Sequence, residues 1–346
     1  MNETDTTSLR VTLGEVENLA DAALRAAGTS ETNARSVARS IAAAEAADLP
    51  SHGLMRLPVY CDHVECGKVD GRIDPVARSN RAGAWRVDAR HGFAHPAIDL
   101  GFRHLVPAAR ETGIAALSVA QSYNCGVLGY HVERLAREGL VALAFANSPP
   151  AIAPWGGSKA FFGTNPIAFA APRRTGAPIV IDQSASVVAR GEVMLRAREG
   201  KAIPEGWALD SDGLPTTSPH AVLDGGSMLP SGGYKGAGIA LIVEIMAAVV
   251  TGASLSAQAS SFTDDKGGPP GTGQFFIAIA PEAFAEGAFS HRLQELVEAM
   301  CREPGVRLPG ARRAAAQMRA AAEGVAVSRA VYDDIAKRTT ERRRIT

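Results

Sequence analysis

The sequence has no excess of charge of either sign and no long hydrophobic run. Among its 346 residues, 36 Lys and Arg balance 36 Asp and Glu. This balance gives no electrostatic case for binding nucleic acid or an anionic membrane, so any bound anion must be held by locally placed basic groups. The longest apolar run, residues 237–250, is interrupted by Glu244 and is too short to cross a bilayer.

Cysteine is scarce, and its spacing offers no framework for a metal site or for disulfides. The four cysteines include no C-x-x-C pair, and only Cys61 and Cys66 are close in sequence. Four free thiols in a long chain suggest a reducing compartment. Residues 1–19 are polar and acidic and lack the apolar centre of a signal peptide. We therefore expect no metal ion and a cytoplasmic location.

The glycine motifs of the common nucleotide-binding folds are also missing. No G-x-G-x-x-G follows an expected strand, and no G-x-x-x-x-G-K-[ST] is present. The segment GGYKG at 232–236 has the wrong spacing for a phosphate loop, but it opens an apolar helix whose first amide groups favour an anion. Lys235 adds a positive charge there. A helix-starting glycine turn with a surface lysine explains the same residues.

The hydrophobic pattern predicts an α/β core with helices at both ends. Apolar residues at helical spacing predict helices within 11–50, and Thr29 or Ser30 can cap the second of them, 31–48. From residue 85 strands alternate with helices, which argues for an α/β core. The expected strands are 85–88, 114–119, 140–146, 166–171, 178–182 and 274–280. The other expected helices are 54–66, 95–112, 129–138, 187–199, 235–251, 290–302 and 311–323.

The length predicts two or three lobes, since single cores stop growing at roughly 250–300 residues. We expect a helical domain over 1–112, completed by C-terminal helices in 286–346. An α/β domain is expected over 113–285. It contains a loop-rich insertion at 200–233, and long loops of this kind usually form lids or walls of a site.

The stretch LPSHGLMRLPVY carries the densest chemistry. A helix cannot continue through Pro50, so Ser51 and His52 lie at an element boundary where side chains can face a cleft. If a new helix follows, His52, Arg56 and Tyr60 share one of its faces. This arrangement puts a proton donor beside a carboxylate clamp. A helix-capping histidine and a solvated arginine would explain the same stretch.

A carboxylate lies at the end of an expected buried strand. Asp182 closes the apolar segment IVID and is followed by Gln183 and Ser184. Such a carboxylate can orient and hold the proton of His52. It can equally cap the following helix.

Two further segments carry polar residues with more than one interpretation. The loop 147–166 is rich in proline and glycine, and its Gly163–Pro166 segment can bind a ligand or simply complete a turn. Arg312 and Arg313 precede an expected helix, where they can meet a phosphate or remain solvated.

Taken together, the motifs resemble the malate/L-lactate dehydrogenase 2 family. The matching segments are SHGLMR at 51–56, APWGG at 153–157, FGTNPIAFAAP at 162–172, VIDQSASVVARGEV at 180–193, IPEGWALDSDG at 203–213, LPSGGYKG at 229–236 and LPGARR at 308–313. The similarity spans about residues 12–335. This family includes sulfolactate, ureidoglycolate and diketogulonate oxidoreductases and the Δ1-piperideine/Δ1-pyrroline-2-carboxylate reductases. It is distinct from the Rossmann-type lactate and malate dehydrogenases.

The resemblance implies a mixed α/β sheet with a family-specific, non-Rossmann NAD(P)-binding topology. It implies that His52 is the proton donor, with Ser51 as its relay partner. Asp182 would orient this acid and border the nicotinamide, and Arg56 would grip the carboxylate of a small substrate. The remaining candidates for substrate binding are Tyr60 and Asn165.

The resemblance also implies a set of cofactor contacts and a homodimer with sites near the subunit interface. The expected contacts are Ser122, Tyr123, Asn124, Cys125, Gly126, Asp182, Gln183, Ser184, Tyr234, Lys235, Pro309, Gly310, Ala311, Arg312 and Arg313. Arg312 and Arg313 can serve a 2′-phosphate, which favours NADP over NAD.

The sequence departs from the family pattern at Asn124, where many members carry a histidine. An asparagine can still form hydrogen bonds, but it cannot donate a charge-assisted one. A substrate assignment that depends on this histidine therefore does not carry over to this chain. The segments DQSAS, in place of the commoner DMATS, and GGYKG, in place of GGHKG, indicate a subgroup that resembles the sulfolactate dehydrogenases more than the cyclic-imine reductases.

We therefore expect an NAD(P)-dependent oxidoreductase that interconverts a 2-hydroxy acid and a 2-oxo acid. One alternative is NADPH-dependent reduction of Δ1-pyrroline- or Δ1-piperideine-2-carboxylate. The other is a non-catalytic nucleotide-binding protein, which would bind the cofactor without turnover.

Overall fold

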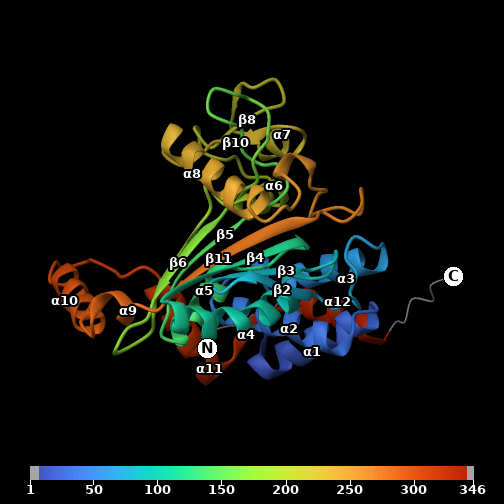
Figure 1. The fold of residues 1–346 in the computed structure, drawn as a ribbon. Helices are drawn as coiled ribbons and strands as arrows, with labels where there is room; N and C mark the ends of the chain where they lie inside the picture. The colour runs from blue at the N-terminus through green and yellow to red at the C-terminus, as the bar shows by residue number, and fades with distance from the viewer. Residues whose placement is uncertain (1–7, 341–346) are drawn as a thin grey trace, which may run out of the picture.

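The structure is a computed structural model that describes residues 8–340. Figure 1 shows a long twisted sheet across the middle of the molecule, a layer of helices below it and a separate lobe above it. The expected mixed α/β fold is confirmed. No helix among the described residues is long and apolar enough to cross a membrane.

The central sheet has seven strands, ordered β2-β3-β4-β11-β5-β6-β7. Their bounds are β2 (Val76–Arg81), β3 (Ala84–Asp88), β4 (Ile114–Ser122), β11 (Thr272–Ile279), β5 (Val141–Ala146), β6 (Ile167–Ala171) and β7 (Ile179–Gln183). Only β3 and β4 pair in parallel. The late strand β11 lies antiparallel between β4 and β5, so that Phe276 pairs with both Leu117 and Ala144. The alternation of strands and helices therefore does not produce a parallel sheet.

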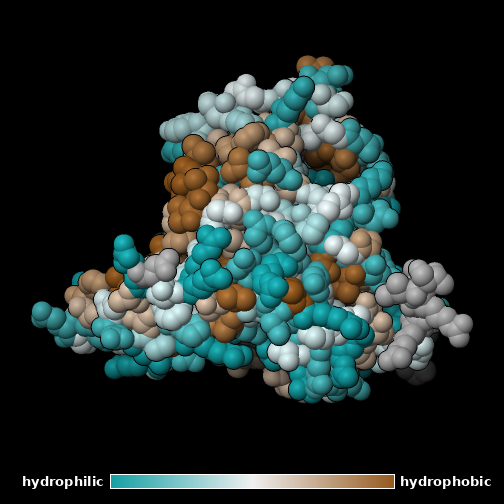
Figure 2. Space-filling model, turned by 45° about the vertical axis from the view of Figure 1, so that its right-hand side comes forward, coloured by the Kyte–Doolittle hydropathy of each residue, from teal (hydrophilic) through white to brown (hydrophobic). Residues whose placement is uncertain are grey.

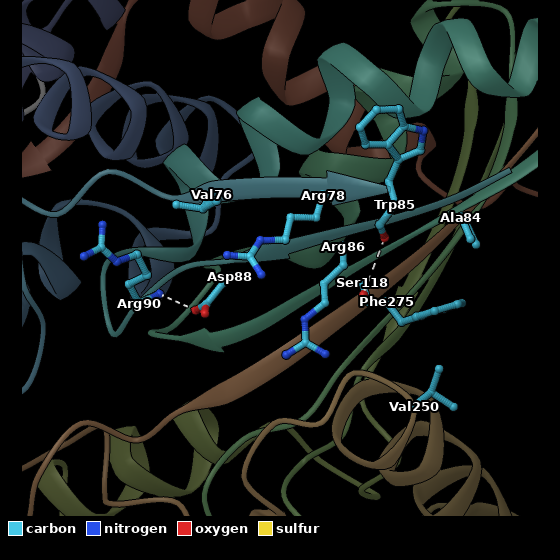
Figure 3. Close-up of a pocket in the computed structure, with 11 residues that line it drawn as sticks. Val76, Arg78, Ala84, Trp85, Arg86, Asp88, Arg90, Ser118, Val250 and Phe275 are labelled. Carbon is cyan, nitrogen blue, oxygen red and sulfur yellow. Dashed lines mark hydrogen bonds between the residues drawn. The ribbon is translucent and has the colours of Figure 1, made fainter. Parts of the chain in front are cut away.

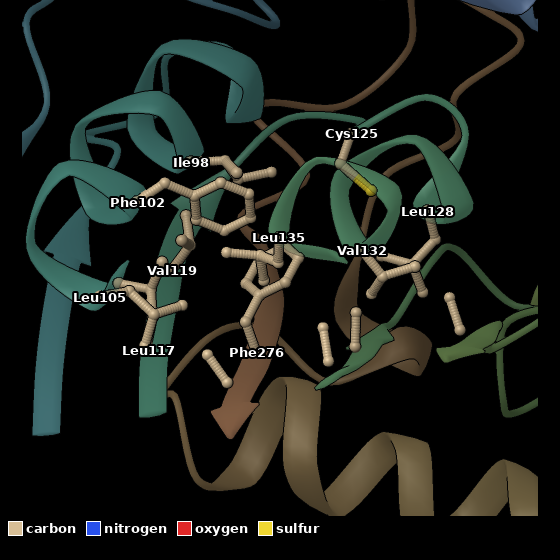
Figure 4. Packing of buried hydrophobic residues seen from close by; sticks show 14 of the residues in the cluster. Ile98, Phe102, Leu105, Leu117, Val119, Cys125, Leu128, Val132, Leu135 and Phe276 are labelled. Carbon is tan, nitrogen blue, oxygen red and sulfur yellow. The ribbon is translucent and has the colours of Figure 1, made fainter. Parts of the chain in front are cut away.

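Two helices, α4 (Ala94–Thr112) and α5 (Leu128–Arg137), cover the lower face of the sheet. Figure 4 shows Phe102 of α4 and Leu135 of α5 packing with Phe276 of the sheet. Gly101 allows α4 to approach closely, because a Cβ there would lie 2.4 Å from a methyl group of Leu117. This core fixes the ends of β4 and α5, between which the loop 123–127 runs.

A second core lies between the helices at the two ends of the chain. It is formed by α1 (Leu13–Ala26), α2 (Glu31–Ala46), α3 (Leu57–Glu65) and α12 (Arg329–Thr340). Ser30 caps α2 through the amide of Asn33 at 3.4 Å, as its position predicts. A short ribbon joins the chain ends, because β1 (Ser8–Val11) pairs antiparallel with β12 (Val325–Ser328).

The remaining C-terminal helices follow β11. They are α9 (Glu282–Ala285), α10 (Phe289–Cys301) and α11 (Ala311–Glu323). Of these, α11 contacts α2, and the turn before it packs on β7.

The upper lobe is built on its own small core. Its elements are α6 (Arg190–Arg198), β8 (Ala208–Leu209), β9 (Pro215–Thr216), α7 (Pro219–Leu223), β10 (Ser227–Met228), α8 (Tyr234–Glu244) and a π-helical turn η3 (Ile245–Val249). Ile152, Phe162, Val193 and Met228 pack together inside it. The segment 200–233, expected to be loop-rich, is held by three two-residue strands and α7.

The proposed division of the chain at residue 112 stays a prediction. The helices of 8–65 and α12 do share one core. The strands β2 and β3 nevertheless come before residue 113 and belong to the central sheet.

Candidate active site

The corner between α2 and α3 consists of two short 3₁₀ helices, η1 (Pro50–His52) and η2 (Leu54–Arg56), instead of the single helix expected over 54–66. Glu45 of α2 holds this corner, because its Oε1 accepts the amide N–H of Leu54 at 2.7 Å. Gly53 lies so close to that carboxylate that an added Cβ would be 2.2 Å from Oε1. The positions of the side chains on both sides of Gly53 are therefore fixed by α2.

His52 lies in this corner with one ring nitrogen engaged. The Oγ of Ser51 is 3.2 Å from its Nδ1. The ring keeps solvent access, but partial burial lowers its pKa, and the positive charges of Arg56 and Arg313 act in the same direction. The negative charge of Asp182 raises the pKa and only partly offsets these effects. Near neutral pH the imidazole is therefore mostly uncharged in the free protein.

Asp182 reaches the same corner from the end of β7. Its Oδ2 accepts the amide N–H of Gly129 at 3.0 Å and Nη1 of Arg313 at 3.1 Å. The side chain is only 10% exposed. Its charge acts on His52, but no hydrogen bond joins the two residues. The structure thus brings Asp182 near His52 and ties it to the first turns of α5 and α11.

Arg56 is bonded to a residue that is far from it in sequence. Its Nη2 donates to the carbonyl oxygen of Phe262 at 2.7 Å. The guanidinium carbon lies 5.9 Å from the centre of the Tyr60 ring. Since a guanidinium has five N–H donors, the remaining donors are available for a carboxylate.

Tyr60 and Asn124 form a second polar pair beside Arg56. The buried Tyr60 hydroxyl donates to Oδ1 of Asn124 at 3.0 Å, and the amide of Gly126 donates to the same oxygen at 2.6 Å. Burial raises the pKa of Tyr60 to about 12, so the phenol remains a donor. These two donors fix which end of the Asn124 amide is the oxygen. Among the described residues its NH₂ group has no hydrogen-bond acceptor.

The other side chains of the 122–126 loop are buried in the protein. Ser122 donates to the carbonyl of Thr272 at 2.9 Å, and the Tyr123 hydroxyl lies 2.6 Å from Nδ1 of His63. Cys125 is 7% exposed, and burial raises its pKa to about 12. Of the five expected cofactor contacts here, only Asn124 and Gly126 keep appreciable exposure.

Asn165 is not part of this group. It is fully buried, and its Nδ2 donates to the carbonyl of Ala240 at 3.0 Å and to Oε2 of Glu244 at 2.8 Å. Its Oδ1 accepts the hydroxyl of Ser256 at 3.3 Å. Because both ends of the amide are used inside the protein, the expected role in substrate binding has no support in this geometry.

The remaining expected cofactor contacts lie on two exposed turns and at the end of β7. Gly310 adopts a φ of +83° and packs against the backbone of Val180, where a Cβ would be 3.0 Å from the carbonyl oxygen. Arg312, next in the same turn, is exposed. Pro309, Ala311 and Gln183 are also exposed, and Ser184 is half-buried.

The second turn opens α8. Tyr234 and Lys235 are exposed there, and the Tyr234 ring meets Trp155 edge-on with centroids 6.2 Å apart. No contact joins this pair to the residues at the corner.

Several residues that hold the site were not found from the sequence. Glu45 fixes the corner, the backbone amide of Gly129 binds Asp182, and the carbonyl of Phe262 binds Arg56. Backbone donors and acceptors have no sequence signature. Phe262 is also 206 residues away from Arg56 along the chain.

A groove that holds none of the expected site residues lies on the upper face of the sheet. It has a volume of about 790 Å³. Figure 3 shows Arg78, Arg86 and Arg90 around it, with Val250 and Phe275 at its other side.

Comparison with known proteins places this geometry in a family. A family model described as malate/L-lactate dehydrogenase matches residues 11–336. The chain belongs to the malate/L-lactate dehydrogenase family. This family of oxidoreductases is the one that the motifs resemble, so the resemblance is confirmed.

Individual relatives within the malate/L-lactate dehydrogenase family have different substrates. A (2R)-3-sulfolactate dehydrogenase (NADP(+)) of Chromohalobacter salexigens is 49% identical over 95% of this chain and 97% of its own length. A Δ1-pyrroline-2-carboxylate reductase of Ancylobacter novellus is 41% identical over 94% of this chain and 96% of its own. The crystal structure of Δ1-piperideine-2-carboxylate reductase from Pseudomonas syringae pv. tomato superposes with a TM-score of 0.91 at 38% identity, covering 95% of this chain and 99% of the other.

Proposed function

We propose that the protein is an NADP-dependent dehydrogenase of a small 2-hydroxy acid, of the sulfolactate type. The observation that carries the proposal is that Arg56 and Asp182 both lie close enough to His52 for their charges to act on its imidazole. The 49% identity with a sulfolactate dehydrogenase supports this choice of substrate class.

Arg56 binds the substrate carboxylate through the N–H groups that Phe262 leaves free. His52 faces the oxygen on the neighbouring carbon, with Ser51 holding its Nδ1. During reduction His52 gives a proton to that oxygen, and during oxidation it takes the proton back. The lowered pKa of His52 favours the neutral form, which is the form that accepts a proton.

Asp182 acts on this step through charge. It favours the protonated form of His52, and its own negative charge is held by Arg313 and by the amide of Gly129. Asn124 presents its free NH₂ group beside Arg56 and Tyr60. We assign it a neutral hydrogen bond to a substrate oxygen, where many family members use a histidine.

The turn at 308–313 fits a phosphate group of a dinucleotide. The backbone amides of Arg312 and Arg313 open α11 and donate to no described atom, which leaves them available to an anion. Arg312 is exposed and forms no ion pair among residues 8–340. It is therefore our candidate for a 2′-phosphate contact, and a bound nicotinamide dinucleotide would supply the hydride.

Reduction of a cyclic 2-imino acid is the second candidate. The specific observations behind it are the 41% identity with a Δ1-pyrroline-2-carboxylate reductase and the similarity in structure to a Δ1-piperideine-2-carboxylate reductase. The same Arg56 would bind the ring carboxylate. His52 would then lie beside the nitrogen of the amine product, because an imine has no carbonyl oxygen to protonate.

Parallel assays separate these candidates. NADPH and NADH oxidation is measured with sulfopyruvate, oxaloacetate and Δ1-pyrroline-2-carboxylate. We expect the highest kcat/KM with sulfopyruvate and NADPH. A preference for the imine would replace the first candidate with the second. Cofactor binding without turnover on any of the three would identify a non-catalytic nucleotide-binding protein.

We also propose that the protein is a homodimer. Figure 2 shows apolar side chains gathered on the upper lobe, and α8 with the turn after it exposes five large ones, namely Leu241 (48%), Ile242 (52%), Ile245 (43%), Val249 (60%) and Val250 (52%). An apolar surface of this kind usually contacts a partner. We expect a dimer mass by light scattering and a monomer for Ile242→Lys.

A cytoplasmic location is proposed as well. Its support is the set of four free cysteines, two of which, Cys61 and Cys125, are buried in the cores. Fractionation of cells that express the protein tests this placement.

A further inference from the structure

Lys68 is a charged residue inside the protein that the proposed reaction does not use. Its side chain is 1% exposed. The ammonium donates to three backbone carbonyl oxygens, those of Ser261 at 2.7 Å, Asp264 at 2.8 Å and Lys266 at 2.7 Å. These bonds use all three of its N–H donors. The nearest carboxylate oxygen, on Asp264, is 3.9 Å away and belongs to a 45% exposed side chain.

The loop 261–266 that surrounds this ammonium also contacts the substrate clamp. Its Phe262 carbonyl accepts Nη2 of Arg56 at 2.7 Å. The Phe262 ring packs edge-on against Tyr123, with centroids 5.4 Å apart. Nε2 of His63 lies 2.8 Å from the Asp264 carbonyl. The loop contains no helix or strand, and besides these contacts it is held by hydrogen bonds of its own, such as that from the Lys266 amide to Oδ1 of Asp264 at 3.0 Å.

We propose that Lys68 is a positioning residue for substrate recognition. Its ammonium gathers the carbonyls of the loop 261–266, and the loop then fixes the Arg56 guanidinium through the Phe262 oxygen. The inference rests on the proposed function, in which Arg56 binds the substrate carboxylate, and it deepens that function by explaining how an otherwise mobile arginine is held in one orientation.

The arrangement resembles a site for a monovalent cation in which the cation is tethered to the chain. Three carbonyl oxygens converge on one point, and their dipoles repel one another when no positive charge is present. Shortening Lys68 to alanine leaves a space bordered by these oxygens. A small ammonium ion added to the solution has the charge and the donors to fill it.

The test compares Lys68→Ala with Lys68→Met, whose longer side chain fills the space without a charge. Steady-state kinetics are measured with a 2-oxo acid and NADPH. In both variants we expect KM for the acid to rise about 10–100-fold, with a much smaller change in kcat and in cofactor affinity. Methylammonium chloride should lower KM again in Lys68→Ala but not in Lys68→Met.

Two controls make the result specific. Asp265→Asn removes a charge from an exposed side chain of the same loop and should leave KM unchanged. Tetramethylammonium chloride at equal ionic strength has no N–H donor and should not restore Lys68→Ala.

An unchanged KM in Lys68→Ala would overturn the proposal. A purely structural role is the conclusion if KM, kcat and cofactor affinity worsen together without rescue, or if neither variant folds. Failure of the proposed function is distinct, because the wild-type protein would then show no turnover with any acid.

Discussion

Two buried polar networks join distant parts of this chain, and they differ in what they leave unbonded. In the first, Lys68 binds the loop 261–266, and that loop holds Arg56. In the second, Glu244 accepts the amide of Ser256 and a bond from Asn165. The second network uses its donors and acceptors internally, whereas the first ends on a guanidinium with free donors. A buried polar network can therefore take part in ligand binding only if it leaves a donor or an acceptor free to bond the ligand.

The largest effect is expected at the catalytic corner. His52→Ala should reduce the rate of reduction by about 10²–10⁴-fold, because the proton donor is lost, while cofactor affinity changes little. Assays of kcat with binding measured separately test this. In the second network, formed by Glu244, Ser256 and Asn165, Ser256→Ala should lower Tm and leave kcat unchanged. Equal activity of His52→Ala and wild type would remove His52 from its proposed role.

Substitution of Arg56 should have the second-largest effect on activity. Arg56→Ala should lower kcat/KM for the acid by about 10–10³-fold, mostly through KM, because a charge-assisted hydrogen bond to a carboxylate is lost. Arg56→Lys should recover only part of this, since an ammonium cannot bind both the Phe262 carbonyl and a carboxylate with a guanidinium's geometry. Full recovery of kcat/KM in Arg56→Lys would show that only the positive charge at this position matters for binding the acid.

The second network should affect stability and not catalysis. Glu244→Gln places an amide NH₂ group against donors, since both carboxylate oxygens accept hydrogen bonds from Asn165 and Ser256. We expect a loss of about 1–3 kcal/mol in the free energy of unfolding. Urea unfolding measures it, and KM at room temperature should not move. A raised KM would show that this network reaches the site after all.

The smallest effect concerns two buried histidines outside both networks. Burial lowers the pKa of His95 to about 4 and that of His131 to about 3. The unfolded chain binds these protons near pH 6.5, so each histidine costs up to about 1.4 kcal/mol of stability per pH unit as the pH falls from there toward its folded pKa.

His95→Leu should therefore flatten the fall in Tm between about pH 7 and about pH 5. Thermal unfolding at both values measures the slope. A wild-type slope in His95→Leu would mean that His95 is charged in the folded protein.

The sequence predicted most elements that depend on local patterns. Local patterns located α2, α4 and α11, and of the two expected caps of α2, Thr29 and Ser30, the structure uses Ser30. Continuous apolar runs located β4 and β5. The insertion of β11 between them, and the pairing of β1 with β12, depend on contacts between residues far apart in the chain.

The site was predictable where function depends on a side chain at a boundary. The charges of Arg56 and Asp182 both act on His52, and the roles of the three residues stay predictions. Asn165 shows the limit of motif reasoning, because a motif cannot indicate whether a side chain faces a cleft or the interior. Its neighbour in the fold, Glu244, is 79 residues away in sequence.

The ribbon formed by β1 and β12 has a consequence for how the protein is made. Its first strand ends at Val11 and its second begins at Val325, so β1 is synthesised long before the strand with which it pairs. Until then Val16 and Leu24 of α1 lack the apolar cover that α12 provides. A nascent chain therefore exposes this apolar face of α1 until α12 has been synthesised, and removal of α12 would leave that face exposed permanently.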